Sequence, residues 1–420
     1  MLDARYIREN EEVVRQALVN RRYDLSVLEK FLDLDKSWRA LTEEGNALRK
    51  KRNEVADEVP KLPKEQKQAK IAEMKGIAER IKQIEVEVRK IEVDRDELLL
   101  NVPNIPDPSV PVGDLDVGDV FVKSWGEQRT FDFQPLKHWE IGEKLDIIDF
   151  DRGAKVAGTG FYVLKGDGAR LERALINFML DLHRDQGYTE VFPPAVINRK
   201  SCVGTGQLPK MHEDMYWIER DDLYLNPTAE VPVTNLFADE ILDRRQLPIH
   251  MTAYLPSFRR EAGKHIETKG IARVHQFNKV ELVKFVLPET SPQELEGLTA
   301  DAEAVVQGLK LPYRLRVLCT GSLGFHSSKT YDIEAFAPGM DQWLEVSSCS
   351  NFKEFQARRA AIKFRREPHL KSEFVHTLNG SGIALPRTMV SVIENYQNKD
   401  GSVTVPEVLR PYMKGAERIE

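Results

Sequence analysis

Cysteine is scarce in this chain of 420 residues. The three cysteines, Cys202, Cys319 and Cys349, lie far apart and include no Cys-x-x-Cys pair. Neither a disulfide framework nor a clustered zinc site is therefore expected. The same scarcity predicts a reducing compartment.

Long apolar runs are also missing. No uninterrupted apolar stretch approaches the length that crosses a membrane, and the first residues, MLDARYIRENEEVV, contain no apolar signal core. We therefore expect a cytoplasmic protein without a membrane partner.

The chain has neither a strong charge excess nor a familiar phosphate loop. Its 61 basic and 67 acidic residues give a net charge of -6, which is no global sign of polyanion binding but leaves room for a local basic region. Neither Gly-x-x-x-x-Gly-Lys-Ser/Thr nor Gly-x-Gly-x-x-Gly occurs. If ATP binds, it binds by another route.

Two helices of heptad spacing give the clearest periodic signal. Mostly apolar residues recur every three and four positions from Phe31 to Val55, and again from Met74 to Leu98. Pro60 and Pro63 lie between these runs and cannot sit inside a continuous helix. The sequence therefore predicts an antiparallel coiled-coil hairpin over about residues 26–100, preceded by a short amphipathic helical segment.

The outer face of this hairpin is rich in lysine, with acidic residues interspersed. One interpretation is a solvated coiled coil whose charges pair along the helices or line a dimer seam. The other is a basic arm that grips a nucleic-acid backbone by neutralising phosphates, which lysines near the predicted tip favour. The candidate nucleic-acid contacts are Lys50, Lys51, Lys61, Lys64, Lys67 and Lys70.

A proline-rich linker follows the hairpin. Residues 101–113, NVPNIPDPSVPVG, contain four prolines and no helical or strand period. The predicted domains are a helical arm at 1–100, this linker, and a larger domain at 114–420.

The larger domain reads as α+β. Strand-like runs cluster without regular alternation with helices, which favours an antiparallel sheet flanked by helices over a Rossmann sheet. Helices are expected at 170–186, 292–308 and 387–397. Strands are expected at 189–192, 223–225, 249–254, 313–319, 329–337 and 342–347.

A charged hairpin is predicted between Ser257 and Glu281, with strands at 258–261 and 272–281. Its side chains offer planar cations for a carboxylate or phosphate, acidic acceptors, and an aromatic face for a base. They are Arg259, Glu261, Arg273, Phe277 and Glu281. Taken alone, the segment also fits an exposed surface ribbon.

Three further segments carry polar side chains next to structural breaks. Thr228 and Glu230 lie in a turn, where Thr228 could equally cap a helix running to Asp243. Glu345 and Ser348 could give oxygen ligands to Mg²⁺, or belong to a polar strand end with capping serines. In the third segment, the glycine-rich strand around Asn379–Gly382 leads into a helix whose first turn bears Arg387. The helix dipole and the guanidinium group could therefore bind the same anion at this helix N-terminus.

Together these segments resemble the seryl-tRNA synthetases of the ordinary bacterial and eukaryotic kind, a family of class II aminoacyl-tRNA synthetases. The resemblance spans the chain. It rests on NIPDPSVPVG, FPPAVINRKSCVGTGQLPK, NPTAEVP, FRREAG, RVHQFNKVE, CTGSLGF, EVSSCSNFKEFQARR and LNGSGIALPRT. The loop GKHIETKG at Gly263–Gly270 departs from the family pattern.

The resemblance implies roles for individual residues. Arg259 and Arg387 are implied as the catalytic arginines. Arg259 would bind the serine carboxylate and the α-phosphate of ATP, and Arg387 would bind the γ-phosphate. The implied Mg²⁺ ligands are Glu345 and Ser348. The implied serine-binding group is Thr228, Ala229, Glu230, Arg259, Glu281, Asn379 and Ser381. The implied ATP-binding group is Arg259, Arg260, Glu261, Val274, Phe277, Glu345, Val346, Ser347, Ser348 and Arg387.

The implied activity is ATP-dependent attachment of L-serine to tRNA(Ser), and to tRNA(Sec) where one exists. The resemblance also implies a class II catalytic domain, Mg²⁺, a serine pocket without zinc, and a homodimer formed through the segment around Pro193 and Pro194. The alternative is a synthetase-like paralogue that activates an amino acid for a carrier protein, or a non-catalytic binding homologue.

Overall fold

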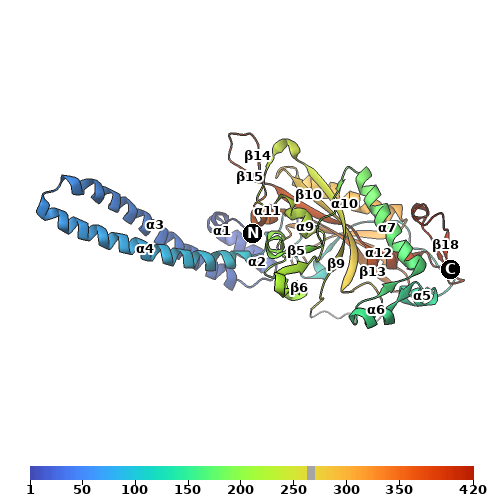
Figure 1. Ribbon diagram of the computed structural model, residues 1–420. Coiled ribbons are helices and arrows are strands. Elements are labelled where there is room, and N and C mark those ends of the chain that lie inside the picture. Colours follow the sequence, from blue (N-terminus) through green and yellow to red (C-terminus); the bar gives the residue numbers. More distant parts are fainter. Residues whose placement is uncertain (263–269) are drawn as a thin grey trace. The chain divides into compact units, whose positions relative to one another are not determined.

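The computed structural model describes residues 1–262 and 270–420 (Figure 1). The side chains of Lys64 and Asp116 and nearly all of the predicted loop Gly263–Gly270 lie outside the described residues. The described chain forms two compact units, one of Leu2–Pro103 and one of Met1 with Asn104–Glu420.

The smaller unit is built from helices. They are α1 (Ala4–Glu9), α2 (Glu11–Asn20), α3 (Ser26–Glu58) and α4 (Lys64–Leu100). The long helices α3 and α4 pack side by side in opposite directions, which confirms the predicted antiparallel helical hairpin (Figure 1). Pro60 lies in the short 3-10 turn between them and Pro63 directly precedes α4, as their missing amide hydrogens require.

The seam between α3 and α4 is narrow and apolar. Its buried residues include Val55, Ile77, Ile81 and Ile84. A methyl group added at Gly45 would lie 3.3 Å from Ile84 Cγ2, so a larger side chain there would push the helices apart. Across the seam, Arg49 Nη2 lies 2.9 Å from Glu85 Oε1.

The lysines predicted to contact nucleic acid all belong to this unit. Lys50, Lys51 and Lys61 are exposed. Lys67 and Lys70 are only half-exposed, although the outer face was predicted to be fully exposed. The side chain of Lys64 is outside the described residues. Glu73 lies between two of the lysines, with Oε1 at 2.9 Å from Lys51 Nζ and Oε2 at 3.0 Å from Lys70 Nζ.

An eight-stranded sheet organises the larger unit. Its order is β1-β11-β12-β13-β16-β10-β9-β4, and neighbours are antiparallel except β4 and β9. The predicted antiparallel sheet is confirmed. The strands are β1 (Val120–Trp125), β4 (Thr189–Glu190), β9 (Ile249–Phe258), β10 (Gln276–Val286), β11 (Tyr313–Val317), β12 (Lys329–Ala337), β13 (Gln342–Lys353) and β16 (His376–Ala384).

The core of the larger unit lies between this sheet and the helices α7 (Gly166–Asp185), α10 (Ser291–Gly308) and α12 (Leu385–Asn395). These helices match the predicted ones within a few residues. Because side chains alternate along a strand, Val280 and Leu282 of β10 enter this core, whereas Lys279, which directly precedes Val280, lines a cavity on the other face of the sheet.

Two glycines of β16 bring helices close to the sheet. A methyl group at Gly380 would lie 3.2 Å from Leu298 Cγ of α10, and one at Gly382 would lie 2.6 Å from His183 Nε2 of α7. The glycine-rich strand therefore serves close packing on its core face. Its other face is left to Asn379 and Ser381.

Smaller elements surround the sheet. The short helices are α5 (His138–Lys144), α6 (Phe150–Ala157), α8 (Arg199–Thr205), α9 (Glu230–Thr234) and α11 (Phe355–Ala360). The short strands are β2 (Ile148–Asp149), β3 (Val163–Leu164), β5 (Val196–Asn198), β6 (Trp217–Ile218), β7 (Leu223–Leu225), β8 (Ile241–Asp243), β14 (Lys363–Arg365), β15 (Glu373–Phe374), β17 (Val403–Thr404) and β18 (Arg418–Ile419). Among the residues described here, no helix has the length and apolar character needed to cross a membrane.

The predicted helix from Thr228 to Asp243 is wrong. α9 ends at Thr234, and Ile241–Asp243 instead forms strand β8, which pairs with β14. Thr228 does not cap α9 either, because the residue at the N-cap is Ala229 and no side chain in the described part of the chain caps that end. Pairing with a strand more than a hundred residues away overrides the local helical pattern.

The strand limits of the charged hairpin also differ from the prediction. The ladder between β9 and β10 ends at the pair Phe258 and Gln276. Beyond it, Arg260 N donates to Asp214 O at 2.8 Å, and Glu261 adopts a φ of 50°, so the chain leaves the strand direction. The predicted row of serines after a strand end is likewise wrong, since β13 continues through Ser350 to Lys353.

Candidate active site

A polar cavity of about 900 Å³ lies on the sheet face opposite the core. Thirteen sequence-predicted residues line it: Thr228, Glu230, Arg259, Glu261, Arg273, Val274, Phe277, Glu345, Val346, Ser348, Asn379, Ser381 and Arg387. Four others, Ala229, Arg260, Glu281 and Ser347, are not part of the lining. The structure thus brings the hairpin, β13 and β16 segments of the sequence to one place.

Glu281 lies fully buried directly behind this lining. Its Oε2 accepts a hydrogen bond from Thr228 Oγ1 at 2.5 Å and lies 2.5 Å from Lys279 Nζ. Its Oε1 accepts from Asn379 Nδ2 at 2.9 Å. Lys279 also donates to Thr228 Oγ1 at 3.0 Å. The buried charge is therefore paired and hydrogen-bonded, as a stable buried carboxylate must be.

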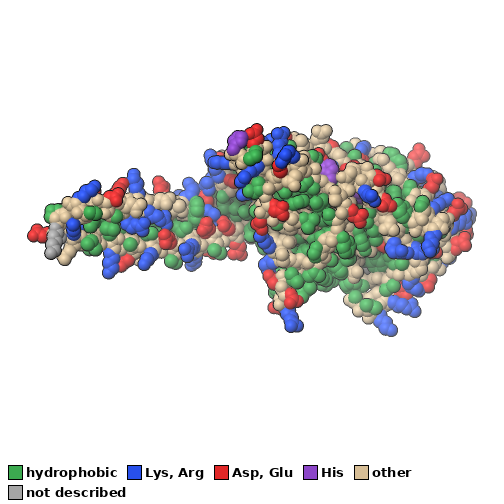
Figure 2. Space-filling model, turned by 45° about the horizontal axis from the view of Figure 1, so that its top comes forward, with side chains coloured by type: hydrophobic (Ala, Val, Ile, Leu, Met, Phe, Trp, Pro, Cys, Tyr) green, Lys and Arg blue, Asp and Glu red, His purple; other side chains and the backbone are tan. Residues whose placement is uncertain are grey.

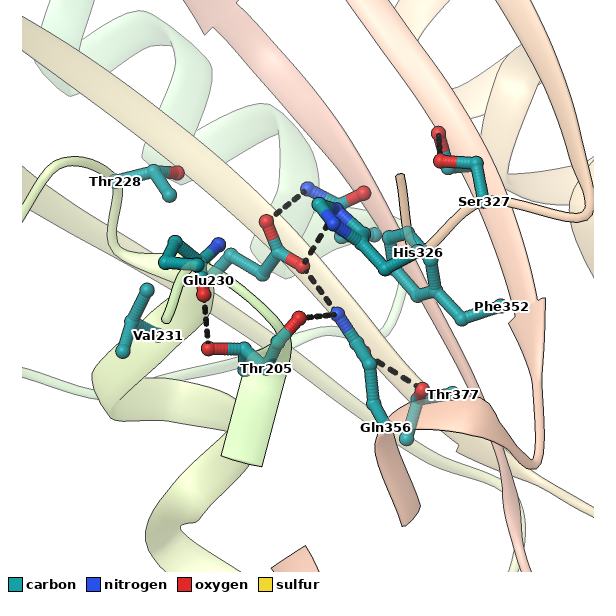
Figure 3. Close-up of polar contacts among 12 residues, drawn as sticks. Thr205, Thr228, Glu230, Val231, His326, Ser327, Phe352, Gln356 and Thr377 are labelled. Atoms are coloured by element: carbon teal, nitrogen blue, oxygen red, sulfur yellow. Dashed lines mark hydrogen bonds and ion pairs between the residues drawn. The ribbon is translucent and has the colours of Figure 1, made fainter. Parts of the chain in front are cut away.

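Glu230 is the second buried carboxylate of the site (Figure 3). Its Oε1 accepts from Gln356 Nε2 at 2.6 Å, and its Oε2 accepts from Asn379 Nδ2 at 3.3 Å. His326 Nε2 lies 3.9 Å from the same Oε1. Burial, reinforced by the nearby Glu281 carboxylate, raises the pKa of Glu230 to about 7.

Arg259 projects from the end of β9 over an aromatic ring. Its guanidinium carbon lies 5.2 Å from the centre of the Phe277 ring, and its Nε donates to Pro227 O at 3.2 Å. Burial lowers the pKa of Arg259, although the group stays a cation in any ordinary buffer. Nearby, Arg273 Nη1 donates to Glu261 Oε2 at 3.1 Å.

The returning chain of the hairpin is anchored to α12. Ile271 N donates to His138 Nε2 at 3.1 Å, so this ring nitrogen acts as an acceptor. His138 Nδ1 then donates to Glu394 Oε1 at 2.9 Å, and both side chains are fully buried. Ala272 and Val274, which follow Ile271, form a wall of the cavity.

Arg387 lines the cavity next to the returning chain of the hairpin. It lies in the first turn of α12, as predicted, and its Nη1 donates to Glu345 O at 2.7 Å. The same Nη1 lies 3.3 Å from Glu345 Oε2, and Arg387 Nε donates to Ala272 O at 3.2 Å. Two guanidinium groups, Arg259 and Arg387, thus line one cavity, an arrangement suited to a polyanion.

Oxygen ligands suited to Mg²⁺ occur on neighbouring strands of the cavity. Ser348 of β13 pairs in register with Asp332 of β12, and Glu345 lines the same wall. Asp332 Oδ1 is buried and has no hydrogen-bond partner among the described residues, and burial together with Glu345 raises the pKa of this carboxyl well above its usual range. The part of the chain described here holds no group of three or more His, Cys, Asp and Glu arranged for a metal. These residues fit an ion held by few protein oxygens and by substrate phosphates.

Four further residues contact or line the site without a predicted role: Lys279, Gln356, His326 and Asp332. Only Lys279 carries a local signal, because it lies between Phe277 and Glu281 at the two-residue spacing of one strand face. Gln356 and His326 come from distant segments and carry no local signal.

Two family models match the chain. The one described as seryl-tRNA synthetase N-terminal domain covers residues 1–106. The one described as tRNA synthetase class II core domain (G, H, P, S and T) covers residues 216–396.

Full-length relatives and solved structures agree with these matches. The chain is 54% identical to a serine–tRNA ligase of Methanosarcina barkeri and 55% identical to one of Carboxydothermus hydrogenoformans, each over 100% of this chain and 99% of the relative. The crystal structure of seryl-tRNA synthetase from Pyrococcus horikoshii complexed with ATP superposes with a TM-score of 0.96 at 39% identity, covering 100% and 99% of the two chains. Fold, motifs and relatives thus agree that the chain belongs to the seryl-tRNA synthetase family of class II aminoacyl-tRNA synthetases.

Proposed function

We propose that this protein is a serine–tRNA ligase. It activates L-serine with ATP to seryl-adenylate, releases diphosphate, and transfers the seryl group to the 3′-terminal adenosine of tRNA(Ser). The observation that carries this proposal is the buried group of Thr228, Glu281 and Asn379 beside Arg259. It offers polar atoms for a small amino acid with a hydroxyl, next to a cation for its carboxylate.

Activation joins two anions, so charge stabilisation is the main catalytic task. The serine carboxylate oxygen attacks the α-phosphorus of ATP in line, and diphosphate leaves from the opposite side. Arg259 is assigned to the carboxylate and the α-phosphate, and Arg387 to the γ-phosphate. No nucleophilic side chain is needed, because positioned cations supply most of the rate enhancement.

The nucleobase is assigned to the hairpin. Phe277 offers a ring face on which adenine stacks, and Glu261 offers an acceptor for its amino group. Val274 and Val346 add apolar contact. The seryl-tRNA synthetase from Pyrococcus horikoshii was crystallised in complex with ATP, and the serine–tRNA ligase from Naegleria fowleri in complex with AMP, which supports the binding of an adenine nucleotide.

Mg²⁺ is assigned to Glu345 and Ser348. The ion, when bound, neutralises phosphate charge in the transition state. Glu345 also contacts Arg387, so the same carboxylate orients the guanidinium that meets the γ-phosphate. Asp332, across the strand pair from Ser348, adds negative charge to this wall.

Serine recognition is assigned to the two buried carboxylates. Glu230 and Thr228 receive the ammonium group, while Glu281 and Ser381, with Asn379, meet the hydroxyl. Alanine lacks that hydroxyl and cannot form a hydrogen bond with this group, so the site should discriminate against it more strongly than against an analogue that lacks only a methylene group.

The helical hairpin of α3 and α4 is the proposed tRNA-binding arm. Lys50, Lys51 and Lys61 are exposed on it, and shape recognition of RNA relies on phosphate contacts of this kind. Domain limits of 1–100 for the arm, 101–113 for the linker and 114–420 for the catalytic domain belong to the same proposal. The arm is also proposed to accept tRNA(Sec).

A homodimer is proposed through the segment around Pro193 and Pro194. Figure 2 shows hydrophobic side chains gathered over one face of the larger unit. Large apolar side chains exposed in the single chain include Phe192 at 81% and Phe121 at 59%. Such a surface is unusual for a monomer.

We also propose a cytoplasmic location, because all three cysteines are free thiols.

The test is serine-dependent charging of tRNA. Purified protein with ATP, Mg²⁺, labelled serine and total tRNA is expected to yield seryl-tRNA, AMP and diphosphate. Serine that becomes attached to a carrier protein instead, or no exchange of diphosphate into ATP with serine, would contradict the proposal.

A further inference from the structure

Gln356 is a fully buried amide that contacts one of the proposed serine ligands (Figure 3). It lies in α11, and its Nε2 donates to Glu230 Oε1 at 2.6 Å and to Thr205 O at 3.2 Å. Its Oε1 accepts from Thr377 Oγ1 at 2.7 Å. Every polar atom of this side chain is therefore used.

The orientation of the Gln356 amide follows from its partners. Glu230 and Thr205 both present acceptors, a carboxylate and a backbone carbonyl, so the NH₂ group must face them. A flipped amide would place its oxygen against two other oxygens. The hydroxyl of Thr377 must then donate to Gln356 Oε1, which fixes the order of a chain from Thr377 through Gln356 to Glu230.

Glu230 needs this support because its surroundings oppose its charge. Burial and the Glu281 carboxylate disfavour ionisation, whereas Gln356, Lys279 and Arg259 favour it. His326 faces the same oxygen at 3.9 Å. A protonated Glu230 could not form an ion pair with an incoming ammonium group, so the balance among these groups matters for amino-acid binding.

The rest of the cavity does not depend on this chain of contacts. Arg387, Glu345 and Phe277, the proposed ATP ligands, have no hydrogen bond to Gln356 or Thr377 among the interactions of the described residues. A change in Gln356 should therefore alter affinity for the amino acid and leave affinity for ATP nearly unaltered.

We propose that Gln356, oriented by Thr377, is a positioning residue that keeps Glu230 ionised and aimed at the ammonium group of the amino-acid substrate. The inference rests on the proposed function. It assigns the Thr377–Gln356 pair a role in amino-acid affinity, although neither residue lines the cavity.

The test measures ATP–diphosphate exchange by the full-length protein with serine. Gln356→Met keeps the size of the side chain and removes both donors, and we expect it to raise the KM for serine about tenfold or more. The KM for ATP should change less than about twofold. Because Glu230 would then lose a donor to its charged form, the loss in kcat/KM for serine should be larger at pH about 6 than at pH about 8.

A matched pair at Thr377 covers the case in which the Gln356 variant fails to fold. Thr377→Val keeps the shape and removes the hydroxyl, while Thr377→Ser keeps the hydroxyl. We expect a higher KM for serine in the first and nearly wild-type values in the second. Equal changes in the two KM values, a pH-independent loss, or identical behaviour of the Thr377 variants would overturn the inference. If the wild-type protein shows no serine-driven exchange, it is the proposed function that fails.

Discussion

The carboxylates of Glu230 and Glu281 share one hydrogen-bond donor. The side-chain nitrogen of Asn379 lies 3.3 Å from Glu230 Oε2 and 2.9 Å from Glu281 Oε1. Both carboxylates are buried, and each has a second partner from elsewhere, Gln356 for Glu230 and Thr228 for Glu281. A neutral amide that donates to both acids lets the two buried carboxylates lie close to each other.

Asn379→Asp should therefore damage amino-acid binding selectively. The change places a third carboxylate between Glu230 and Glu281 and removes their shared donor. We expect the KM for serine in the exchange reaction to rise about tenfold or more, with the KM for ATP affected much less. Asn379→Ala, which removes the donor without adding charge, should be the milder variant. An aspartate variant with normal serine affinity would contradict this arrangement.

The raised pKa of Glu230 predicts an acid limb in the pH profile. Burial brings this pKa to about 7, so the carboxylate loses its charge as the pH falls through that value. We expect kcat/KM for serine, which reports the free enzyme, to fall there also. In Glu230→Gln the limb should vanish and activity should be low throughout. If kcat/KM for serine still falls with pH in the same way in this variant, the titrating group is not Glu230.

Arg259→Ala should nearly abolish formation of seryl-adenylate. The guanidinium over Phe277 is the cation proposed to meet both reacting anions, so exchange activity should fall by about 10³-fold. Arg245→Ala is the control, because its side chain is 89% exposed and pairs with Asp243 away from the cavity. Wild-type exchange in the Arg259 variant would refute the assigned role.

Charge reversal on the helical arm should affect tRNA and spare activation. Changing Lys61, Lys64 and Lys67 to glutamate is expected to raise the KM for tRNA(Ser) about tenfold or more and to reduce its salt dependence. Exchange with serine should stay at the wild-type rate. The control is Lys414→Glu, an exposed lysine of the larger unit. Unaltered charging kinetics in the triple variant would exclude these lysines as tRNA contacts.

Local sequence patterns predicted the helical hairpin of the smaller unit and several elements that carry the site in the larger unit. The heptads of α3 and α4 and the strand-to-helix step at Arg387 appear in the structure because short-range periodicity and turn chemistry determine them. The family resemblance predicted that four residues would lie around one cavity, namely Arg259, Phe277, Asn379 and Arg387. Composition alone does not predict this arrangement.

Long-range contacts account for what the sequence did not predict. Gln356 lies 126 residues from Glu230, and the two come together because α11, which carries Gln356, and α9, which carries Glu230, both pack against α8. Thr228 was predicted as a possible helix cap because the following residues have helical character, yet its hydroxyl donates a hydrogen bond to Glu281 instead. A side chain can form its hydrogen bond with a neighbour in sequence or with a residue far along the chain. The fold determines which partner it meets, and local sequence patterns do not show that choice.

Discrimination between serine and alanine tests whether the buried group around Glu281 recognises a hydroxyl. The measurement is kcat/KM for both amino acids in ATP–diphosphate exchange, with wild-type protein and Glu281→Gln. We predict a preference for serine of at least about 10³-fold that is sharply reduced in the variant. Comparable rates with serine and alanine in the wild-type protein would exclude recognition of the hydroxyl by this group.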